Sequence, residues 1–207
     1  MRNNRFEPPT AVEGGRMSGR RISLAGWHVH AQRASSPNAD ARPAEERVEL
    51  IVIHNISLPP GKFGGRDVQR LFTNRLRSRD HPDYPAIGML RVSAHFFIRR
   101  DGRLMQFVST QRRAWHAGAS AWRGRGRCND FSIGIELEGT DVRPYTGRQY
   151  QRLARLVQAL VLRYPEICGV AGHDEIAPGR KTDPGASFDW PRFIAQSGLP
   201  QRFRELN

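Results

Sequence analysis

The 207-residue chain has little cysteine, little lysine and no long apolar run. Its two cysteines, Cys128 and Cys168, are too few for the disulfide framework of a small extracellular domain. No stretch approaches the ~18 apolar residues of a membrane-spanning helix. No apolar segment follows the charged N-terminus, so a secretory signal is not expected. These absences argue against a membrane protein or a disulfide-stabilised protein and favour the cytoplasm.

The chain is strongly basic, with a formal net charge of +13, yet Lys62 and Lys181 are its only lysines. The arginines are scattered and do not form a basic run interleaved with aromatic residues, as a nucleic-acid interface would. We therefore predict neither a nucleic-acid partner nor a membrane partner. The scarcity of lysine draws attention to the two that are present.

Length and composition predict one domain. Hydrophobic residues make up 38% of the chain, enough for a substantial core. Residues 1–21 are polar and read as a disordered tail, which leaves residues 22–207 for a single folded domain. Purine-rich codons necessarily encode Glu13-Gly14-Gly15, so a natural start at Met17 is one expectation and a translated tail is the other.

Hydrophobic patterning predicts a mixed α/β (α+β) fold with a central sheet flanked by helices. The expected strands are residues 48–54, 92–99, 103–108, 131–137 and 169–172. The expected helices are residues 66–76 and the segment that a capping box opens at Thr146 and Pro165 ends. Asp101-Gly102 predicts a two-residue hairpin turn. Residues 80–85 and 114–130 are expected to be loops.

Polar side chains stand where two predicted strands end. His54 closes the first strand, and His173 follows the strand at residues 169–172. Lys181 and Asp183 are two residues apart in an extended segment, so they can face one pocket. Two histidines and a carboxylate suit a catalytic zinc site with an open fourth position. Seven histidines permit many such sets, however, so spacing alone identifies this one weakly.

Five ordered blocks resemble one enzyme family. They include Ile53-His54-Asn55, Arg91-Val92-Ser93-Ala94-His95, Ala114-Trp115-His116-Ala117-Gly118, Gly134-Ile135-Glu136-Leu137-Glu138 and Lys181-Thr182-Asp183-Pro184-Gly185. They resemble the type 2 N-acetylmuramoyl-L-alanine amidases, whose fold is shared with peptidoglycan-recognition proteins. The closest similarity is to the AmpD-type branch, which acts on 1,6-anhydro-muropeptides in the cytoplasm. The resemblance covers most of the chain, from about residue 24 to residue 193.

The resemblance implies a zinc enzyme of peptidoglycan recycling. It places Zn²⁺ on His54, His173 and Asp183, and it assigns acid/base catalysis to Glu136 and transition-state stabilisation to Lys181. The reaction would be hydrolysis of the amide between N-acetylmuramic acid and L-alanine. Relatives further from this branch tend to carry tyrosine where Glu136 stands, so glutamate favours the AmpD-type branch. A monomer is expected.

Further residues in the matched blocks are candidates for substrate binding. They are Asn55, Arg91, Trp115, His116 and Arg127. Muropeptides carry carboxylates, which arginine binds in a bidentate manner. For His116, packing within the loop is an equally weighted alternative. Three other candidates receive structural interpretations: Glu138 as a hydrogen-bonding carboxylate, His95 as a buried histidine, and His28 with His30 as a surface pair.

Two departures from the family pattern and two other functions remain open. Asp174-Glu175 adds carboxylates beside His173, which could alter the electrostatics of the site, and the N-terminal tail has no counterpart. A hydrolase of intact peptidoglycan would need export or a wall-binding module. A non-catalytic peptidoglycan-binding module would be expected to lack the full set of zinc ligands.

Overall fold

Two long neighbouring strands form the centre of the molecule. In the computed structural model, which describes residues 21–205, these are β3 (Leu50–Ile56) and β9 (Ser132–Glu138), paired in parallel. All of β9 and the first five residues of β3 are buried, as the continuous apolar run of β3 predicts for a central strand. The predicted tail, apart from Arg21, lies outside the described residues.

The sheet extends in both directions from this pair. Its order is β1-β5-β4-β9-β3-β10, with β4–β5 the antiparallel pair and the other neighbours parallel. The remaining strands of this sheet are β1 (Gln32–Arg33), β4 (Phe96–Ile98), β5 (Leu104–Gln106) and β10 (Gly169–Gly172). Two small ribbons accompany it: β2 (Ala39–Ala41) with β6 (Arg112–Ala114), and β7 (Ala121–Trp122) with β8 (Arg125–Gly126). The mixed α/β prediction is therefore confirmed.

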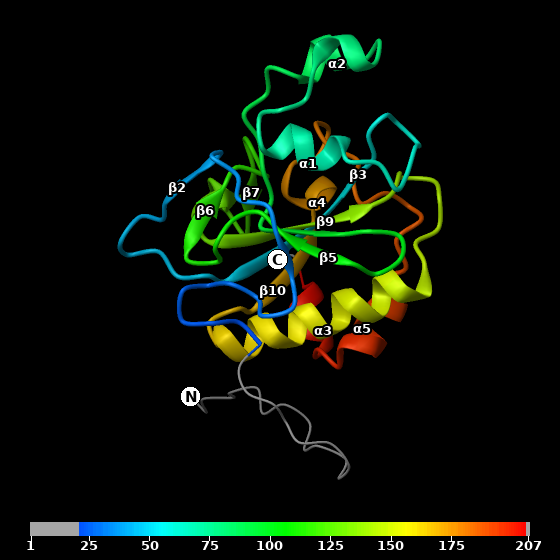
Figure 1. The fold of residues 1–207 in the computed structure, drawn as a ribbon. Helices are drawn as coiled ribbons and strands as arrows, with labels where there is room; N and C mark the ends of the chain where they lie inside the picture. Colours follow the sequence, from blue (N-terminus) through cyan, green and yellow to red (C-terminus); the bar gives the residue numbers. More distant parts are fainter. Residues whose placement is uncertain (1–20, 206–207) are drawn as a thin grey trace, which may run out of the picture.

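Helix α3 (Gly147–Arg163) and helix α5 (Trp190–Ser197) cover one face of the sheet (Figure 1). The predicted capping box of α3 is present, with Thr146 Oγ1 accepting from Gln149 N and Gln149 Oε1 accepting from Thr146 N. The apolar stripe of α3 meets strand residues that include Ile51, Ile133 and Ile135. Burial of this stripe holds the helix on the sheet and leaves the opposite face of β9 free for the site.

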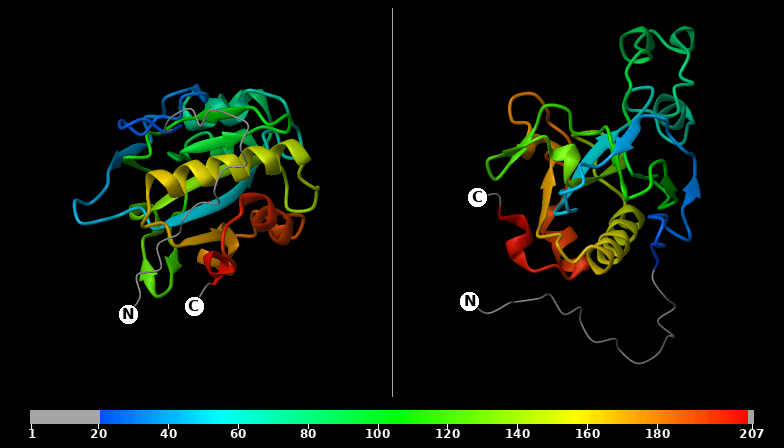
Figure 2. Two further views of the ribbon diagram at one scale, coloured as in Figure 1. Left: turned by 90° about the horizontal axis from the view of Figure 1, so that it is seen from below. Right: turned by 90° about the vertical axis from the view of Figure 1, so that its left-hand side faces the viewer.

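Short helices and loops cover the other face. Helix α1 (Asp67–Phe72) packs Val68, Leu71 and Phe72 against Phe97 and Met105. Helix α2 (Tyr84–Ile87) projects beyond α1, and both chain ends of the described part lie on the side of α3 and α5 (Figures 1 and 2). The remaining elements are α4 (His173–Ile176) and the 3-10 turns η1 (Ser78–Asp80), η2 (Cys128–Asp130) and η3 (Gln201–Arg204). No helix within residues 21–205 is long and apolar enough to cross a membrane.

Several predicted boundaries are wrong. The strand expected over residues 92–99 begins only at Phe96, because Ser93 N donates to Trp115 O instead of to a sheet neighbour. Residues 84–87 are helical, since proline suits the first turn of a helix. Residues 114–130 are not a continuous irregular loop but contain the β7–β8 hairpin and η2.

The hairpin between β4 and β5 also differs from the expected two-residue turn. Arg99 N donates to Arg103 O and Gly102 N donates to Arg99 O, so the loop comprises residues 100–102. Only Gly102 has a positive φ there, +83°. This is the three-residue connection in which a glycine in the left-handed region follows a tight turn.

Candidate metal centre

Three potential ligands converge at the carboxyl ends of two neighbouring strands. His54 lies on β3, and His173 directly follows β10, where Gly172 pairs with Ile53. Asp183 reaches the same point from the loop after α4. His54 Nδ1 lies 3.0 Å from His173 Nδ1, and Asp183 Oδ2 lies 3.1 Å from each of them. These three residues are the group of potential ligands in the described part of the chain that is compact enough to hold a metal ion.

The donor set fits zinc. Tetrahedral Zn²⁺ with bonds of ~2.0–2.1 Å needs ligand atoms separated by about 3.3 Å, close to the observed spacing. Burial lowers the pKa of His54 to about 4, so its ring is neutral, as a metal ligand must be. Asp183, whose Oδ2 lies 3.1 Å from both Nδ1 atoms, supplies the third donor as a carboxylate oxygen. The site therefore presents two imidazole nitrogens and one carboxylate oxygen.

The hydrogen bond at Nε2 of His173, the ring nitrogen that is not directed at the other two ligands, fixes the tautomer of this ring. His173 Nε2 lies 3.1 Å from Ala117 O. A carbonyl oxygen only accepts hydrogen bonds, so Nε2 carries the proton. Nδ1 is thereby left with its lone pair directed at His54 and Asp183. Arg180 also donates to Ala117 O, at 2.6 Å, and so holds this carbonyl in place.

A chain of hydrogen bonds from Ser132 through His116 to Nε2 of His54 fixes the tautomer of the His54 ring. Ser132 Oγ donates to Cys128 O at 2.5 Å, so it is free to accept from His116 Nε2 at 3.2 Å. Burial, with His54 and His95 nearby, holds the pKa of His116 well below its usual value, so its ring carries a single proton, at Nε2. His116 Nδ1 then accepts from His54 Nε2 at 2.9 Å. This leaves His54 Nδ1 unprotonated and facing the other two ligands.

Glu136 lies beside the ligands with an unsatisfied oxygen. It is paired with His54 in the β3–β9 register, its side chain is buried, and its Oε2 has no hydrogen-bond partner. Burial raises the pKa of Glu136 well above its usual value; nearby Asp183 raises it further, and Lys181 opposes the shift. A buried, unpaired carboxyl group of this kind is costly to keep and is characteristic of a catalytic site.

Lys181 and the loop that carries Asp183 are placed by a polar network. Lys181 is exposed, and its charge acts on both Glu136 and His54. Asn55 Nδ2 donates to Pro184 O at 3.1 Å and to Asp141 Oδ1 at 2.7 Å. Thr182 Oγ1 donates to the second oxygen of Asp141 at 2.6 Å. Asp141 therefore ties the end of β3 to the segment that bears the third ligand.

A groove runs from this network along the ends of β3 and β9. Its volume is about 460 Å³, and its walls are Asn55, Ile56, Ser57, Pro60, Gly61, Gly139, Thr140, Asp141 and Val142. Among the residues predicted to bind substrate, Asn55 lines it. Trp115 is partly exposed, whereas Arg91 and Arg127 are exposed. Arg91 donates to Met89 O at 3.3 Å and Arg127 to Asp130 Oδ2 at 2.9 Å.

The structural interpretation of Glu138 is confirmed. Its two oxygens accept from Gly64 N at 2.6 Å and Arg100 N at 2.9 Å. Glu138 therefore holds the loop beside the groove, and each of its oxygens has a hydrogen-bond partner.

The buried histidine interpretation of His95 is also confirmed. Its Nδ1 accepts from Gly134 N at 3.1 Å, and Nε2 lies 3.0 Å from Arg112 O. The surface pair is wrong for His28, which is buried and accepts from His30 N at Nδ1, whereas His30 is exposed. Glu175, one of the two additional carboxylates, is neutralised by Arg204 at 2.5 Å.

Sequence analysis missed the residues that orient the ligands: Ser132, Gly134, Asp141, Tyr145 and Arg180. Gly134 carried a usable signal, since a glycine inside a buried strand marks a close approach by another group. A Cβ at that position would collide with Cγ, Nδ1 and Cδ2 of His116. Tyr145, which donates to Pro184 O at 2.7 Å, carried no comparable signal.

Comparisons with known proteins agree with this geometry. Residues 44–186 match the family model described as N-acetylmuramoyl-L-alanine amidase. The 1,6-anhydro-N-acetylmuramyl-L-alanine amidase AmpD of Citrobacter freundii is 57% identical over 171 residues, which cover 82% of this chain and 91% of that protein.

Comparison with solved structures also finds similarity to amidases. A crystal structure of a selenomethionine AmpD derivative matches with a TM-score of 0.83 and 55% identity, over 84% of this chain and 98% of that one. A complex of the Escherichia coli amidase AmiD with its substrate anhydro-N-acetylmuramic acid-L-Ala-D-γ-Glu-L-Lys matches with a TM-score of 0.55 and 32% identity, over 77% of this chain and 61% of that one. The segment that matches the family model contains all three candidate ligands, Glu136 and Lys181.

Proposed function

Because this chain belongs to the N-acetylmuramoyl-L-alanine amidase family, as an AmpD-type member, we propose that it is a zinc-dependent amidase of cytoplasmic peptidoglycan recycling. Its substrate is a 1,6-anhydro-muropeptide, and the bond cleaved is the amide between the lactyl group of N-acetylmuramic acid and L-alanine. The observation that carries the proposal is the convergence of His54 Nδ1, His173 Nδ1 and Asp183 Oδ2 beside the unpaired Glu136 oxygen. The protein acts as a monomer.

His54, His173 and Asp183 hold the metal. Bound Zn²⁺ would polarise the scissile carbonyl and lower the pKa of water from 15.7 to about 7. The hydrogen bonds on the outer nitrogens of both histidines keep the Nδ1 lone pairs in place before a metal arrives. The ligand set is therefore preorganised by the protein.

Glu136 is the general base and then the general acid. Its free Oε2 accepts a proton from the attacking water and later delivers that proton to the leaving amine of L-alanine. The raised pKa of Glu136 suits both directions of transfer, because a carboxyl group of ordinary pKa would return the proton poorly at neutral pH.

Lys181 stabilises the negative charge that develops on the carbonyl oxygen. Its ammonium group lies close enough to affect the pKa of Glu136 and of His54, which supports this role. Removing one such donor typically costs roughly 2.7–4 kcal/mol of transition-state stabilisation.

His116 positions His54, a role that its hydrogen bonds favour over direct contact with substrate. A conservative pair of variants separates the two roles. His116→Gln can still accept from His54 Nε2, whereas His116→Phe cannot. We expect His116→Phe to weaken zinc binding about 10–100-fold, and His116→Gln to weaken it less, in competition titrations with a chromophoric chelator. Equal zinc affinity in both variants and wild type, with only KM changed, would return His116 to substrate binding.

The other residues predicted to bind substrate have direct or indirect roles in this proposal. Arg91, Arg127 and Trp115 offer two guanidinium groups and an aromatic surface to the sugar and the carboxylates of the stem peptide. Asn55 contributes indirectly, since its amide is already bonded to Asp141 and Pro184. Its replacement should displace the loop that carries Asp183.

Mass spectrometry of reaction products tests the function. The protein should release free stem peptide and anhydro-N-acetylmuramic acid from an anhydro-muropeptide, and a chelator should abolish this until Zn²⁺ is restored. Intact sacculi should release little peptide under the same conditions. Undiminished turnover in metal-free protein would refute the zinc mechanism. Faster release from sacculi than from the fragment would instead identify a hydrolase of intact peptidoglycan, and fractionation of the native host tests the cytoplasmic location.

A further inference from the structure

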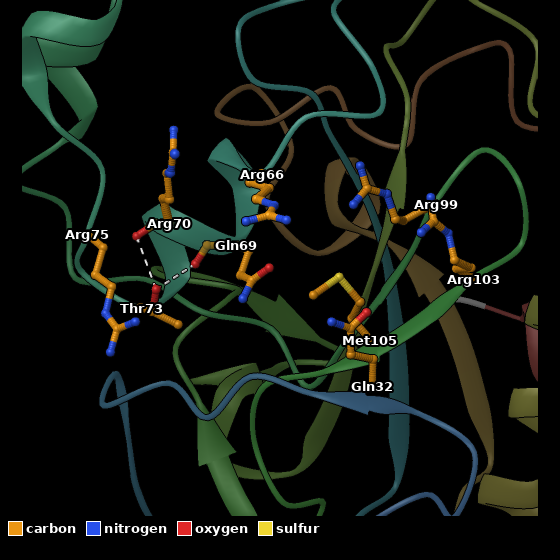
Figure 3. A pocket seen from close by; sticks show the side chains of 9 residues that line it. All are labelled: Gln32, Arg66, Gln69, Arg70, Thr73, Arg75, Arg99, Arg103 and Met105. Carbon is orange, nitrogen blue, oxygen red and sulfur yellow. Dashed lines mark hydrogen bonds between the residues drawn. The ribbon is translucent and has the colours of Figure 1, made fainter.

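A second hollow lies between α1 and the β4–β5 hairpin, and the proposed mechanism does not use it. Its volume is about 440 Å³, and it is lined by Gln32, Arg66, Gln69, Arg70, Thr73, Arg75, Arg99, Arg103 and Met105. Figure 3 shows the side chains of the α1 region on one side of the hollow and those of the hairpin on the other. None of the candidate metal ligands or proposed catalytic residues lines it.

The arginine content of the hollow exceeds that of the chain. Five of its nine lining residues are arginines, whereas the whole chain has 31 among 207 residues once its two lysines are subtracted from 33 basic residues. No carboxylate is among the lining residues, although the chain has 20 acidic residues. A general excess of arginine does not explain a concave surface with five arginines and no carboxylate among its nine lining residues.

Three of the five arginines have carboxylate partners. Arg70 pairs with Asp67 at 2.8 Å, and Arg103 pairs with Asp101 at 2.6 Å. Arg99 donates to Gly65 O at 2.6 Å and lies 3.8 Å from Glu138.

Arg66 and Arg75, which flank α1, make no ion pair with any residue of the described chain. Both are exposed, so their guanidinium groups have all their donors available to a ligand. The hollow thus holds five guanidinium groups against three nearby carboxylates.

We infer that this hollow binds a small anion that carries a diphosphate group. Guanidinium groups bind phosphate oxygens in a bidentate manner, and a diphosphate places two to three negative charges close together, as the two unpaired arginines require. Gln32 and Gln69 add amide donors to the lining. The volume lies in the range of small-molecule sites, ~300–1,000 Å³, which favours a small ligand over a polymer. The inference does not depend on the proposed amidase mechanism.

Calorimetric titration with inorganic pyrophosphate tests the inference, at physiological ionic strength and with the zinc-loaded full chain. Wild-type protein should bind one equivalent. The double variant Arg66→Gln/Arg75→Gln should bind about tenfold more weakly or worse, as expected when hydrogen bonds to a charged group are lost. Arg148→Gln/Arg155→Gln is the matched control, since it removes the same charge from exposed positions of α3 and should bind within about twofold of wild type.

Four outcomes would overturn the inference. Three of them are no saturable binding of pyrophosphate, an equal loss of affinity in the control variant, and tighter binding of citrate than of pyrophosphate. Absence of saturable binding would show that the hollow is not an anion site. An equal loss in the control variant would attribute binding to the overall charge of the protein, and tighter binding of citrate would identify a site for polycarboxylates. Tighter binding of a single-stranded oligonucleotide, lost in the Arg66→Gln/Arg75→Gln protein, would replace the small anion with a nucleic-acid backbone. Amide hydrolysis by the double variant, measured in parallel, shows that its active site is folded.

Discussion

The positions of individual protons and hydrogen bonds determine which side-chain atoms of this site are free to bind a metal or to accept a proton. His54 and His173 each present an Nδ1 lone pair because their Nε2 atoms donate elsewhere, to His116 and to Ala117 O. Two glutamates on β9, Glu136 and Glu138, differ in whether all their carboxylate oxygens have hydrogen-bond partners. Both oxygens of Glu138 accept backbone N–H groups, whereas one oxygen of Glu136 has no partner. Chemically identical carboxylates therefore have different roles, one structural and one suited to proton transfer.

Substitution of the two glutamates should separate these roles. Glu136→Gln should retain zinc but lose kcat by roughly 10²–10⁴-fold, the usual contribution of a general acid/base. Glu138→Gln should keep most of its kcat and lose thermal stability, because it disturbs the loop at Gly64. Steady-state kinetics combined with metal analysis gives the ranking. The opposite order would move catalysis to Glu138.

The buried His28 should make stability depend on pH. Burial lowers its pKa to about 4, whereas an unfolded histidine titrates near 6.5. Between these values the unfolded chain binds a proton that the folded chain does not, so the free energy of unfolding falls as the pH decreases from 6.5 to 4. From pH 7 to pH 5 this group should account for about 2 kcal/mol.

Urea denaturation at the two pH values measures this contribution. His28→Asn, which keeps an acceptor for His30 N, should show a smaller loss of stability than wild type. His30→Gln should reduce the loss only in part, because burial is the largest cause of the lowered pKa of His28 and the charge of His30 is the second. The same loss in His28→Asn as in wild type would show that other groups cause the pH dependence.

At the scale of secondary-structure elements, parallel pairing brings the ligands together. Because β10 pairs with β3 in register, His173 emerges opposite His54, and because β9 pairs with β3, Glu136 lies on the other side of it. The strand β9 has a further function at Gly134, where the missing side chain leaves room for the His116 ring. The packing around Gly134 thus affects the orientation of a candidate metal ligand, His54, through His116.

Gly134→Ala should therefore weaken zinc binding although residue 134 touches no metal. The added Cβ displaces the His116 ring, and loss of such an outer hydrogen bond typically costs about 10–100-fold in metal affinity. Gly126→Ala is a suitable control in β8, because the nearest atom to its added Cβ, Ser120 O, is 3.8 Å away. Competition titration with a chelator measures both variants. Wild-type zinc affinity in a folded Gly134→Ala protein would contradict the positioning role of His116.

At the scale of the whole molecule, the candidate centre joins distant parts of the chain. His54 and His173 are separated by 119 positions, and Asp183 comes from a loop held by Asn55 and Tyr145. An ion bound here is bound only by the folded chain, so binding and global stability are linked.

Removal of metal should lower the melting temperature. Free Zn²⁺ at 100 times its Kd adds about 2.7 kcal/mol to the free energy of unfolding, which corresponds to roughly 5–10 °C for a domain of this size. Differential scanning calorimetry with and without chelator measures the shift, and Mg²⁺ should not restore it. A His54→Ala/His173→Ala protein should show no shift. A shift of wild-type size in that variant would place the stabilising metal elsewhere.

Some features of this protein were determined by local sequence. The capping box at Thr146, the apolar stripe of α3, the buried run of β3 and the alternation of β9 depend on residues a few positions apart, so periodicity predicts them. The resemblance of ordered blocks also predicted the three candidate ligands, Glu136 and Lys181. The boundaries were less accurate where a backbone group bonds to a distant loop, as Ser93 N does to Trp115 O.

The tertiary structure decided what individual polar groups do. No spacing rule predicts that His116 meets His54, that Asp141 ties Asn55 to Thr182, or that Arg66 and Arg75 face a hollow without carboxylates. These outcomes depend on which distant segments a side chain meets and on which hydrogen bonds remain unmade after folding. Sequence determines the chemical type of each group, whereas its protonation, partner and exposure follow from contacts between segments that the folded sheet alone brings together.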